Sequence, residues 1–303
     1  MRRTKTLAAI GIAATALLAL TACNSGSPSN PGGGTGDGGD GGDKPLFEVA
    51  TDVTLDGSPT FDKMTEAGKV TIGVKEDQPG LGYLDVTTNE RSGFDIDIAR
   101  WIAASLGFDE DKIEFKPIAS ANREQAIVNG DIDYYVGTYS ITDKRKEQID
   151  FAGPYFVTGQ GLLVAKDAPE ADKIEDFSGK TVCSATGSTP IQNIKANFPD
   201  IKTQEYDLYS ACVQDLLDGK VDAVTTDQAI LIGFAAQYPD EIKVTGGLFT
   251  EERYGVGLPK GDDVLRAHIN DLFTEGGDTW QAIFDKNLGS SGIEVDQPAV
   301  DAY

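Results

Sequence analysis

Few residues of this chain have the types and spacing that enzymatic chemistry requires. The single histidine, His268, lies in a polar stretch with helical periodicity, where we expect a solvated surface position, so neither a Ser-His-Asp nor a Cys-His nucleophile pair is indicated. No Cys-x-x-Cys motif or histidine cluster offers a transition-metal site. The glycines from Gly32 to Gly42 are not flanked by a predicted strand or helix, as a phosphate-binding loop would be. Catalysis is therefore disfavoured, and we expect neither a metal nor a cofactor.

Short apolar runs alternate with amphipathic stretches along most of the chain. The run 70–74 predicts a buried strand, and Ile98, Ile102 and Leu106 share one side of a predicted helix over 96–106. Further strands are expected at 113–115, 134–136, 161–165, 181–184, 223–226 and 254–258, and further helices at 123–128, 190–197, 211–218, 228–238, 262–275 and 279–286. This alternation predicts an α/β fold with mostly parallel strands.

Two heptapeptides, residues 127–133 and 216–222, share one pattern. Each has the end of a helix, a glycine, and then Ile-Asp or Val-Asp opening a strand. The copies begin 89 residues apart, as expected if two lobes carry similar units. The repeat therefore indicates a protein of two lobes.

Residues 1–22 have the layout of a secretory signal peptide. Three cations precede an apolar run, 7–20, that is too short for a permanent membrane helix. The tetrapeptide Leu20-Thr21-Ala22-Cys23 resembles the lipobox of bacterial lipoproteins, in which Cys23 is diacylated and becomes the new N-terminus. The alternative is an ordinary signal peptide with a chance cysteine. Arg2 and Arg3 fit the positive charge that usually begins a signal peptide better than they fit a twin-arginine export signal.

The segment that follows, residues 23–45, is dominated by Gly, Ser, Pro, Asn and Asp, which predicts a flexible linker. The chain from 46 to 303 is long enough for two lobes. The formal charge of −23 becomes −26 once the three cations of the signal are removed. Such acidity argues against nucleic acid and against adsorption to anionic lipid, so an anionic ligand must be attracted by local cations.

Two cysteines, Cys183 and Cys212, remain when Cys23 is assigned to lipid. Because an exported chain leaves the reducing cytoplasm, we expect them to form a disulfide, with two free buried thiols as the alternative. Closing this 30-residue segment would stabilise the fold by about 3–4 kcal/mol in the loop-entropy model.

Several motifs along the chain resemble one family when they are taken together. They are Gly93-Phe94-Asp95-Ile96-Asp97 with the helix that follows to 106, Ala121-Asn122-Arg123, Ser140-Ile141-Thr142-Asp143-Lys144-Arg145, residues 150–155, 179–182 and 187–189, and Thr226-Asp227. This set is similar to the family 3 extracellular solute-binding proteins, the receptors of polar amino-acid ABC importers. The resemblance spans about 68–288, and the segment 182–189 resembles the glutamate-binding branch.

The resemblance implies a type II fold like that of periplasmic binding proteins. Two mixed sheets flanked by helices form two lobes, and two strand crossovers hinge them. We expect an N-terminal extension at 46–67, lobe 1 at 68–158 and 250–288, lobe 2 at 159–249, and a tail at 289–303 that packs on a lobe or is left loose.

The resemblance and the chemistry of the side chains together predict a ligand site. Its residues are Lys75, Arg123, Thr138, Ser140, Arg145, Ser188, Thr189 and Asp227. The planar fork of Arg145 suits the α-carboxylate of an amino acid, and Ser140 adds a hydroxyl and an N–H. Asp227 and the backbone carbonyl of Thr138 would accept hydrogen bonds from the α-ammonium.

Ser188 and Thr189 open a predicted helix, where free N–H groups and the helix dipole favour a carboxylate. For Ser188 and Asp227 the alternative role is that of a helix N-cap.

The side chain of the ligand is the harder question. Family members that bind neutral ligands often clamp them between aromatic rings, but this chain has Gln78 and Ser120 at the matching positions. It offers Arg123 and Lys75 instead, and an added buried cation is unfavourable unless the ligand brings a second anion. This favours glutamate or aspartate over glutamine or a basic amino acid. The alternative for Arg123 is a surface salt bridge with Glu124 or Asp131.

The sequence thus predicts a monomeric substrate-binding lipoprotein on the extracytoplasmic face of the cell membrane, delivering an acidic amino acid to ABC permease and ATPase subunits. Three alternatives stay open: a binder of glutamine or another polar amino acid, an enzyme like cyclohexadienyl dehydratase on the same fold, and a sensor domain for a signalling partner. The enzyme would need a general acid and no anchor for an amino group, which Asp227 and Ser140 do not fit.

Overall fold

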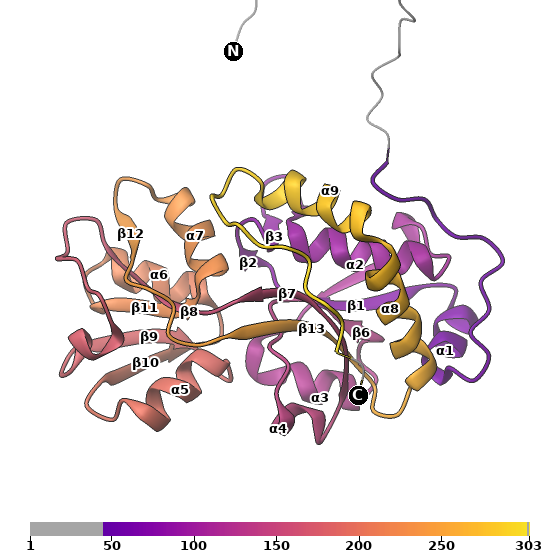
Figure 1. Ribbon diagram of the computed structural model, residues 1–303, viewed down its shortest axis with the longest axis horizontal. Coiled ribbons are helices and arrows are strands. Elements are labelled where there is room, and N and C mark those ends of the chain that lie inside the picture. Colours follow the sequence, from indigo (N-terminus) through magenta and orange to yellow (C-terminus); the bar gives the residue numbers. More distant parts are fainter. Residues whose placement is uncertain (1–44, 302) are drawn as a thin grey trace, which may run out of the picture. The chain divides into compact units, whose positions relative to one another are not determined.

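The computed structural model describes residues 45–301 and 303. The predicted signal peptide, Cys23 and all but the last residue of the predicted linker lie outside the described residues. From residue 45 onward the chain is organised around two five-stranded sheets, which we call the sheets of lobe 1 and lobe 2 (Figure 1).

The sheet of lobe 1 has the strand order β5-β1-β6-β13-β7. These strands are β1 (Val70–Val74), β5 (Ile113–Pro117), β6 (Tyr134–Tyr135), β7 (Asp150–Thr158) and β13 (Glu252–Leu258). Strand β1 pairs in parallel with β5 and β6, whereas β13 runs antiparallel to β6 and β7. The β-branched residues Val70, Ile72 and Val74 suit a strand and are fully buried.

Helices and a small sheet complete lobe 1. The helices are α1 (Pro59–Ala67), α2 (Phe94–Ser105), α3 (Arg123–Val128), α4 (Asp143–Lys146), α8 (Asp263–Glu275) and α9 (Gly277–Leu288), and the small antiparallel sheet consists of β2 (Asp77–Gln78), β3 (Gly82–Asp85) and β4 (Glu90–Ser92). Helix α2 buries Phe94, Ile98 and Ile102 in the core. The predicted extension 46–67 belongs to this packing, since Leu46 and Phe47 contact the core and α1 begins at the N-cap Ser58.

The sheet of lobe 2 has the strand order β10-β9-β11-β8-β12. Its strands are β8 (Gln160–Ala165), β9 (Thr181–Ala185), β10 (Lys202–Tyr206), β11 (Ala223–Asp227) and β12 (Ile242–Thr245), and its helices are α5 (Thr189–Asn197), α6 (Tyr209–Leu217) and α7 (Gln228–Gln237). A disulfide between Cys183 and Cys212 joins β9 to α6. Each of these helices follows a strand of the sheet: α5 begins at Thr189 after β9, α6 at Tyr209 after β10, and α7 at Gln228 directly after β11.

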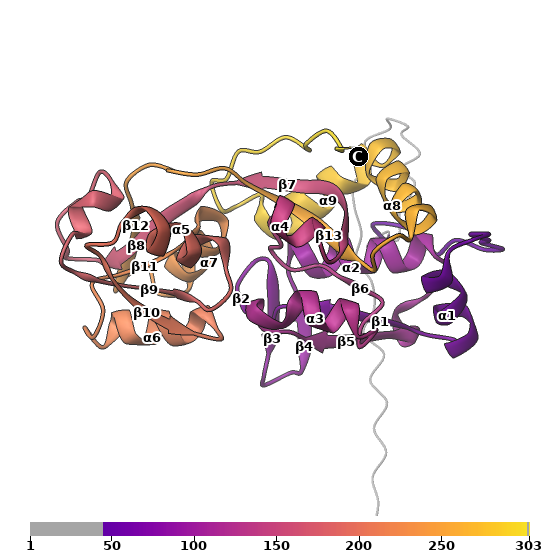
Figure 2. The ribbon, with the colours of Figure 1, turned by 90° about the horizontal axis from the view of Figure 1, so that it is seen from below.

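Two crossovers connect the lobes, as the resemblance implies. Strand β7 of lobe 1 continues through Gly159 into β8, and β12 returns through 246–251 into β13 (Figures 1 and 2). The crossovers lie side by side, because Thr158 pairs with Glu252 and the amide of Gln160 donates to Thr250 Oγ1 at 3.0 Å. A Cβ at Gly159 would approach the carbonyl oxygen of Thr250 to 2.3 Å, so only glycine fits where the two strands meet.

Most predicted elements are confirmed to within a few residues, including both copies of the helix-to-strand repeat. The expectation of mostly parallel sheets is wrong, because the crossover strands enter each sheet antiparallel to their neighbours. The expectation of a solvated His268 is also wrong. Its side chain is half-buried, with Nε2 3.0 Å from Ser105 Oγ, and burial lowers its pKa.

The segment after α9 packs along β7 and β13 and returns to lobe 1 (Figure 2). Asp301 donates its amide to the carbonyl of Gly153 at 3.0 Å and pairs with Arg253 at 2.8 Å. Tyr303 accepts a hydrogen bond from the amide of Phe151 at 2.7 Å. Of the two alternatives for the tail, the structure therefore shows packing on a lobe.

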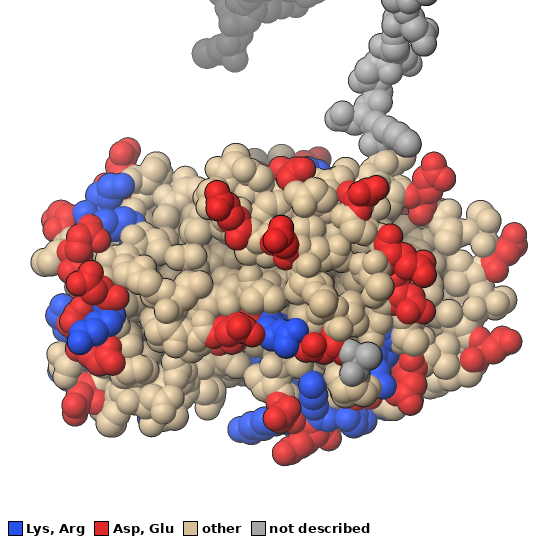
Figure 3. Space-filling model, in the orientation of Figure 1, with Lys and Arg blue, Asp and Glu red and all other residues tan. Residues whose placement is uncertain are grey.

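The surface matches the acidic composition of the chain. Acidic side chains are spread over the face seen in Figure 3, with cationic side chains between them. No helix within residues 45–301 is long and apolar enough to cross a membrane.

Candidate functional site

Residues from both lobes meet around a cleft where the predicted site residues gather. The hydroxyl of Ser140 in lobe 1 lies 3.3 Å from that of Thr189 in lobe 2, and Arg145 Nη2 donates to the carbonyl of Gly187 at 3.2 Å. A cavity of about 530 Å³ opens beside these contacts. It is lined by Ser120, Ala121, Glu124, Gln125, Thr142, Lys144, Arg145 and Gln148 of lobe 1 and by Gly187, Thr189 and Gln192 of lobe 2.

Arg123 opens α3 and is buried in the cleft, with 2% of its surface exposed. Its Nε donates to the carbonyl of Ser120 at 3.1 Å and its Nη1 to that of Thr138 at 3.3 Å, and the guanidinium lies 4.2 Å from the centre of the Tyr139 ring. No carboxylate of the described residues lies within 4.0 Å of it. The alternative of a surface salt bridge with Glu124 or Asp131 is therefore wrong: carbonyls and an aromatic face hold this cation.

Lys75 follows β1 directly and is also buried, with 3% exposed. Its Nζ donates to Ser120 Oγ at 2.6 Å. Burial, reinforced by the positive charge of Arg123, lowers the pKa of Lys75 to about 7. Lys75 and Arg123 thus form a buried cationic pair on lobe 1, joined through Ser120.

Arg145 lies in α4, whose N-cap Thr142 accepts a hydrogen bond from the Arg145 amide. Its Nε donates to Glu124 Oε1 at 3.0 Å and its Nη1 to the carbonyl of Ser140 at 2.7 Å. With the bond to Gly187, three of its five N–H groups have acceptors among residues 45–301, which leaves two for a carboxylate. Burial and the nearby Arg123 lower its pKa, though a guanidinium remains charged.

Thr138 has a left-handed backbone (φ 47°), uncommon for a residue other than glycine. Its amide donates to Asp95 Oδ2 at 3.0 Å and its hydroxyl to Gln78 Oε1 at 3.1 Å. The carbonyl oxygen of Thr138, which we expect to bind the α-ammonium, already accepts a hydrogen bond from Arg123. Because a carbonyl oxygen has two lone pairs, it can accept a second hydrogen bond from the ammonium. Strained backbone held by buried partners is typical of binding sites.

Lobe 2 contributes the start of α5. Ser188 is its N-cap, since Ser188 Oγ accepts from the amide of Ile191, so the alternative role for Ser188 is present in the structure. Thr189 donates to Glu252 Oε2 at 2.8 Å and therefore accepts from Ser140. Ser140, Thr189 and Glu252 form a hydrogen-bonded chain across the cleft to the β13 crossover strand.

Asp227 ends β11 and is buried, with 3% exposed. It precedes α7, but its side chain makes no capping hydrogen bond, which removes the alternative role for this residue. Its Oδ2 accepts from Tyr254 Oη at 2.6 Å, and its Oδ1 has no partner among the described residues. Burial, then the charge of Glu252, raise the pKa of Asp227 to about 8.

Several buried polar atoms around the cleft have no hydrogen-bond partner within the described part of the chain. They are Gln78 Nε2, Thr226 Oγ1, Asp227 Oδ1 and the hydroxyls of Tyr135 and Tyr139. Buried polar groups are normally satisfied by protein, ordered water or ligand, so this cluster marks a polar site between the lobes.

Five further residues around the cleft were not predicted as site residues from the sequence: Tyr139, Tyr209, Tyr254, Glu252 and Asp95. Tyr209 opens α6 beside Ser188 and Thr226, and burial with the neighbouring Asp227 raises its pKa to about 12. Tyr254 is two residues after Glu252 on β13, so both reach the cleft from one strand. Asp95 lies within one of the family motifs and Tyr139 directly precedes another, so the sequence could have pointed to these two. The other three residues lie outside the motifs.

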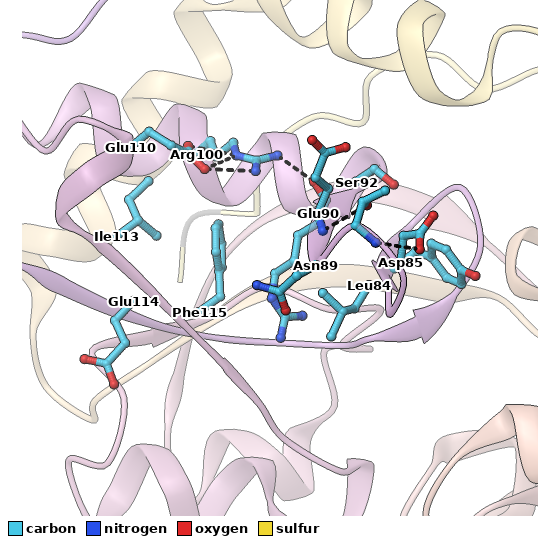
Figure 4. Close-up of a pocket in the computed structure, with 13 residues that line it drawn as sticks. Leu84, Asp85, Asn89, Glu90, Ser92, Arg100, Glu110, Ile113, Glu114 and Phe115 are labelled. Atoms are coloured by element: carbon cyan, nitrogen blue, oxygen red, sulfur yellow. Dashed lines mark hydrogen bonds and ion pairs between the residues drawn. The ribbon is translucent and has the colours of Figure 1, made fainter. Parts of the chain in front are cut away.

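A larger hollow of about 890 Å³ lies between β3, β4 and β5 of lobe 1 and contains none of the predicted residues (Figure 4). Both of its cations are already paired: Arg100 Nε lies 2.9 Å from Glu110 Oε2, with its guanidinium 5.5 Å from the Phe115 ring, and Arg91 lies 4.0 Å from Glu76. Within 45–301, no group of three or more His, Cys, Asp or Glu side chains could hold a metal.

Comparisons with known proteins agree with this architecture. Residues 70–290 match the sequence model of the bacterial extracellular solute-binding proteins, family 3. The chain is 40% identical over 255 residues to the glutamate-binding protein GluB of Corynebacterium glutamicum, covering 80% of this chain and 85% of that one. It is 40% identical to the glutamine-binding protein of Geobacillus stearothermophilus, over 68% of this chain and 79% of that one.

Among solved structures, the solute receptor for L-cysteine of Neisseria gonorrhoeae is similar, with a TM-score of 0.72 and 27% identity over 80% of this chain and 99% of that one. These relatives are binding proteins and not enzymes. The two-lobed architecture, the matched family motifs and these likenesses agree, and the chain belongs to the bacterial extracellular solute-binding proteins of family 3.

Proposed function

We propose that this protein captures an acidic amino acid, glutamate or secondarily aspartate, in the interlobe cleft and delivers it to the permease and ATPase subunits of an ABC importer. The observation that carries the proposal is the pairing of the cleft's cations: Lys75, Arg123 and Arg145 are all buried, but only Arg145 has a carboxylate partner among the described residues. An acidic amino acid brings two carboxylates, one for Arg145 and one for the cations Lys75 and Arg123, which have no carboxylate within 4.0 Å among the described residues.

The α-groups of the ligand would bind where the lobes meet. Arg145 would hold the α-carboxylate with its two remaining N–H groups, beside the Ser140 and Thr189 hydroxyls and the amide end of α5 that Ser188 caps. Asp227 would accept a hydrogen bond from the α-ammonium on Oδ1, which has no partner within the described part of the chain.

The side-chain carboxylate would lie against the buried cationic pair of Lys75 and Arg123. Burying these cations without an anion is unfavourable, and burial already lowers the pKa of Lys75. Glutamine has no second anion to offer. Its binding remains the alternative, because relatives of similar identity are named for glutamate and for glutamine.

Arg123→Ala tests the ligand class. We expect the variant to lose about tenfold more affinity for glutamate than for glutamine, since only glutamate presents a charge to Arg123, and tenfold corresponds to about 1.4 kcal/mol. Calorimetry with both ligands, on wild type and variant, measures the difference.

Arg100→Ala is the matched control, because Arg100 also lies over an aromatic ring of lobe 1 but outside the cleft. It should leave both affinities unchanged. An equal loss of glutamate and glutamine in Arg123→Ala, or a wild type that prefers glutamine or arginine, contradicts the acidic-ligand assignment.

We also propose that Cys23 carries a lipid that holds the protein on the extracytoplasmic face of the membrane. The motif at 20–23 and the Gly-rich segment after it support this. Cys23→Ala should release the protein or leave an unprocessed precursor, as fractionation and lipid labelling would show. A mature, lipid-labelled and membrane-retained product from that variant would refute the anchor.

A further inference from the structure

One segment of lobe 1 reaches into lobe 2 at the edge of the cleft. It consists of β2 (Asp77–Gln78) and the turn that follows, and its consecutive residues Asp77, Gln78 and Pro79 have different partners. Asp77 Oδ2 accepts a hydrogen bond from the amide of Ser210, in the first turn of α6, at 3.0 Å. The carbonyl oxygen of Pro79 faces Gly233 of α7, where a Cβ would lie only 2.2 Å away. The segment is therefore wedged between two helices of the opposite lobe.

Helix α6 lacks an N-terminal cap from its own lobe. Its N-cap residue, Leu208, has no side-chain acceptor, and its first turn contains no acidic residue. The first amides of a helix have no partner within the helix and carry partial positive charge. Asp77, only 9% exposed, supplies the charged acceptor from lobe 1. When the lobes separate, this hydrogen bond is lost and the amides return to water.

The capped turn of α6 also belongs to the cleft. Tyr209, the residue before Ser210, lies beside Ser188 and Thr226. The disulfide at Cys212 ties the same helix to β9, the strand that leads to Ser188. Between Asp77 and Pro79, Gln78 accepts from the Thr138 hydroxyl inside the cleft. The contact between Asp77 and α6 is thus continuous with the candidate site on both lobes.

We propose that Asp77 is a positioning residue for closure of the lobes: by capping α6 across the cleft it stabilises the closed arrangement and holds Tyr209 against the ligand site. The effect on ligand affinity rests on the function proposed above, whereas the effect on closure does not. Because the cap acts on the closed state, it raises the affinity of any ligand held between the lobes, whatever its side chain.

Asp77→Ala should therefore weaken L-glutamate and L-glutamine alike, by about tenfold, mainly through faster dissociation. Asp77→Asn should recover most of the affinity, since an asparagine side chain also caps helices. In the ligand-free protein, small-angle X-ray scattering should show a larger radius of gyration for Asp77→Ala than for wild type. Asp263→Ala, at an exposed aspartate in the first turn of α8, is the control and should change neither measurement.

A second variant tests the same contact without touching the carboxylate. Gly233→Ala should weaken both ligands and open the ligand-free protein, because the added Cβ meets the Pro79 carbonyl, although alanine favours a helix more than glycine does. Gly277→Ala, at the first residue of α9 and outside both crossovers, should have no effect, because the added Cβ makes only an ordinary contact of 3.4 Å with Gln297 Oε1.

Three outcomes overturn the proposal. The first is unchanged binding and scattering in both Asp77→Ala and Gly233→Ala. The second is an equal loss in Asp77→Ala and Asp77→Asn, which would exclude capping. The third is a loss confined to glutamate, which would assign the effect to the nearby Lys75, whose pKa the charge of Asp77 raises. If the wild type binds no amino acid but the scattering differences appear, the proposed function fails and the role of Asp77 in closure stands.

Discussion

Arg145→Ala is expected to weaken every amino-acid ligand by roughly 30-fold or more. Removing one partner of a buried charge pair costs about 2–5 kcal/mol, because the other charge is left without a counterion. Here two carboxylates would lose their partner, that of the ligand and that of Glu124, which lies 3.0 Å from Arg145 Nε. The bond to the Gly187 carbonyl across the cleft would be lost as well. Calorimetry with glutamate, aspartate and glutamine measures the loss.

Two further variants make this result specific. Arg145→Lys keeps the charge but not the planar fork, so its loss should be intermediate. Arg253→Ala removes an arginine of the same lobe that pairs with Asp301 of the tail, and it should leave binding unchanged. A loss of less than about threefold for all ligands in Arg145→Ala would remove Arg145 from the α-carboxylate site.

Asp227→Asn is expected to lower affinity by about two orders of magnitude at pH 8 and to change how affinity depends on pH. The neutral amide cannot pair with the α-ammonium, so the charge interaction is lost for every amino acid. Because burial and Glu252 raise the pKa of Asp227 to about 8, the empty site binds a proton below that pH. An ammonium needs the ionised carboxylate, so binding releases this proton and affinity rises with pH up to about 8.

Lys75 changes the pH dependence of affinity in the opposite direction, and it does so only for an acidic ligand. Its pKa is about 7, and the side-chain carboxylate needs its charged form, so glutamate binding takes up a proton above pH 7. Affinity for glutamate should therefore rise to pH 7, stay level to pH 8 and then fall. Affinity for glutamine should rise to pH 8 and then level off.

Titration calorimetry from pH 5.5 to 9 tests both profiles. Asp227→Asn should lose the rising limb for both ligands, while the fall for glutamate at high pH stays. Asp222→Asn is a control at the other end of β11, at an exposed residue that the cleft does not include. A wild-type affinity for glutamine that does not change between pH 6 and 8 would show that Asp227 is ionised in the empty site.

Local chemistry made much of the fold predictable from the sequence alone. The spacing of apolar residues located β1 and α2, because a strand buries alternate side chains and a helix buries side chains three or four positions apart. The glycines at 130 and 219 end helices through a left-handed backbone, which located both strands that follow. Short polar strands such as β2 and β4 were missed, because with two or three residues they have no periodicity to read.

The type of site was also predictable, since the motifs around Arg145 and Asp227 contain its charged groups. The burial, pairing and protonation of these groups could not be predicted from the sequence. Only the folded chain buries Arg123 with no described carboxylate within 4.0 Å, brings Glu252 from the return strand beside Asp227, and joins Ser140 of one lobe to Thr189 of the other. Desolvation and charge interactions depend on distance in space, not in sequence. The order of residues therefore determined which groups the site contains, and the tertiary structure decided which are paired, which are left unpaired, and how the two lobes hold together around them.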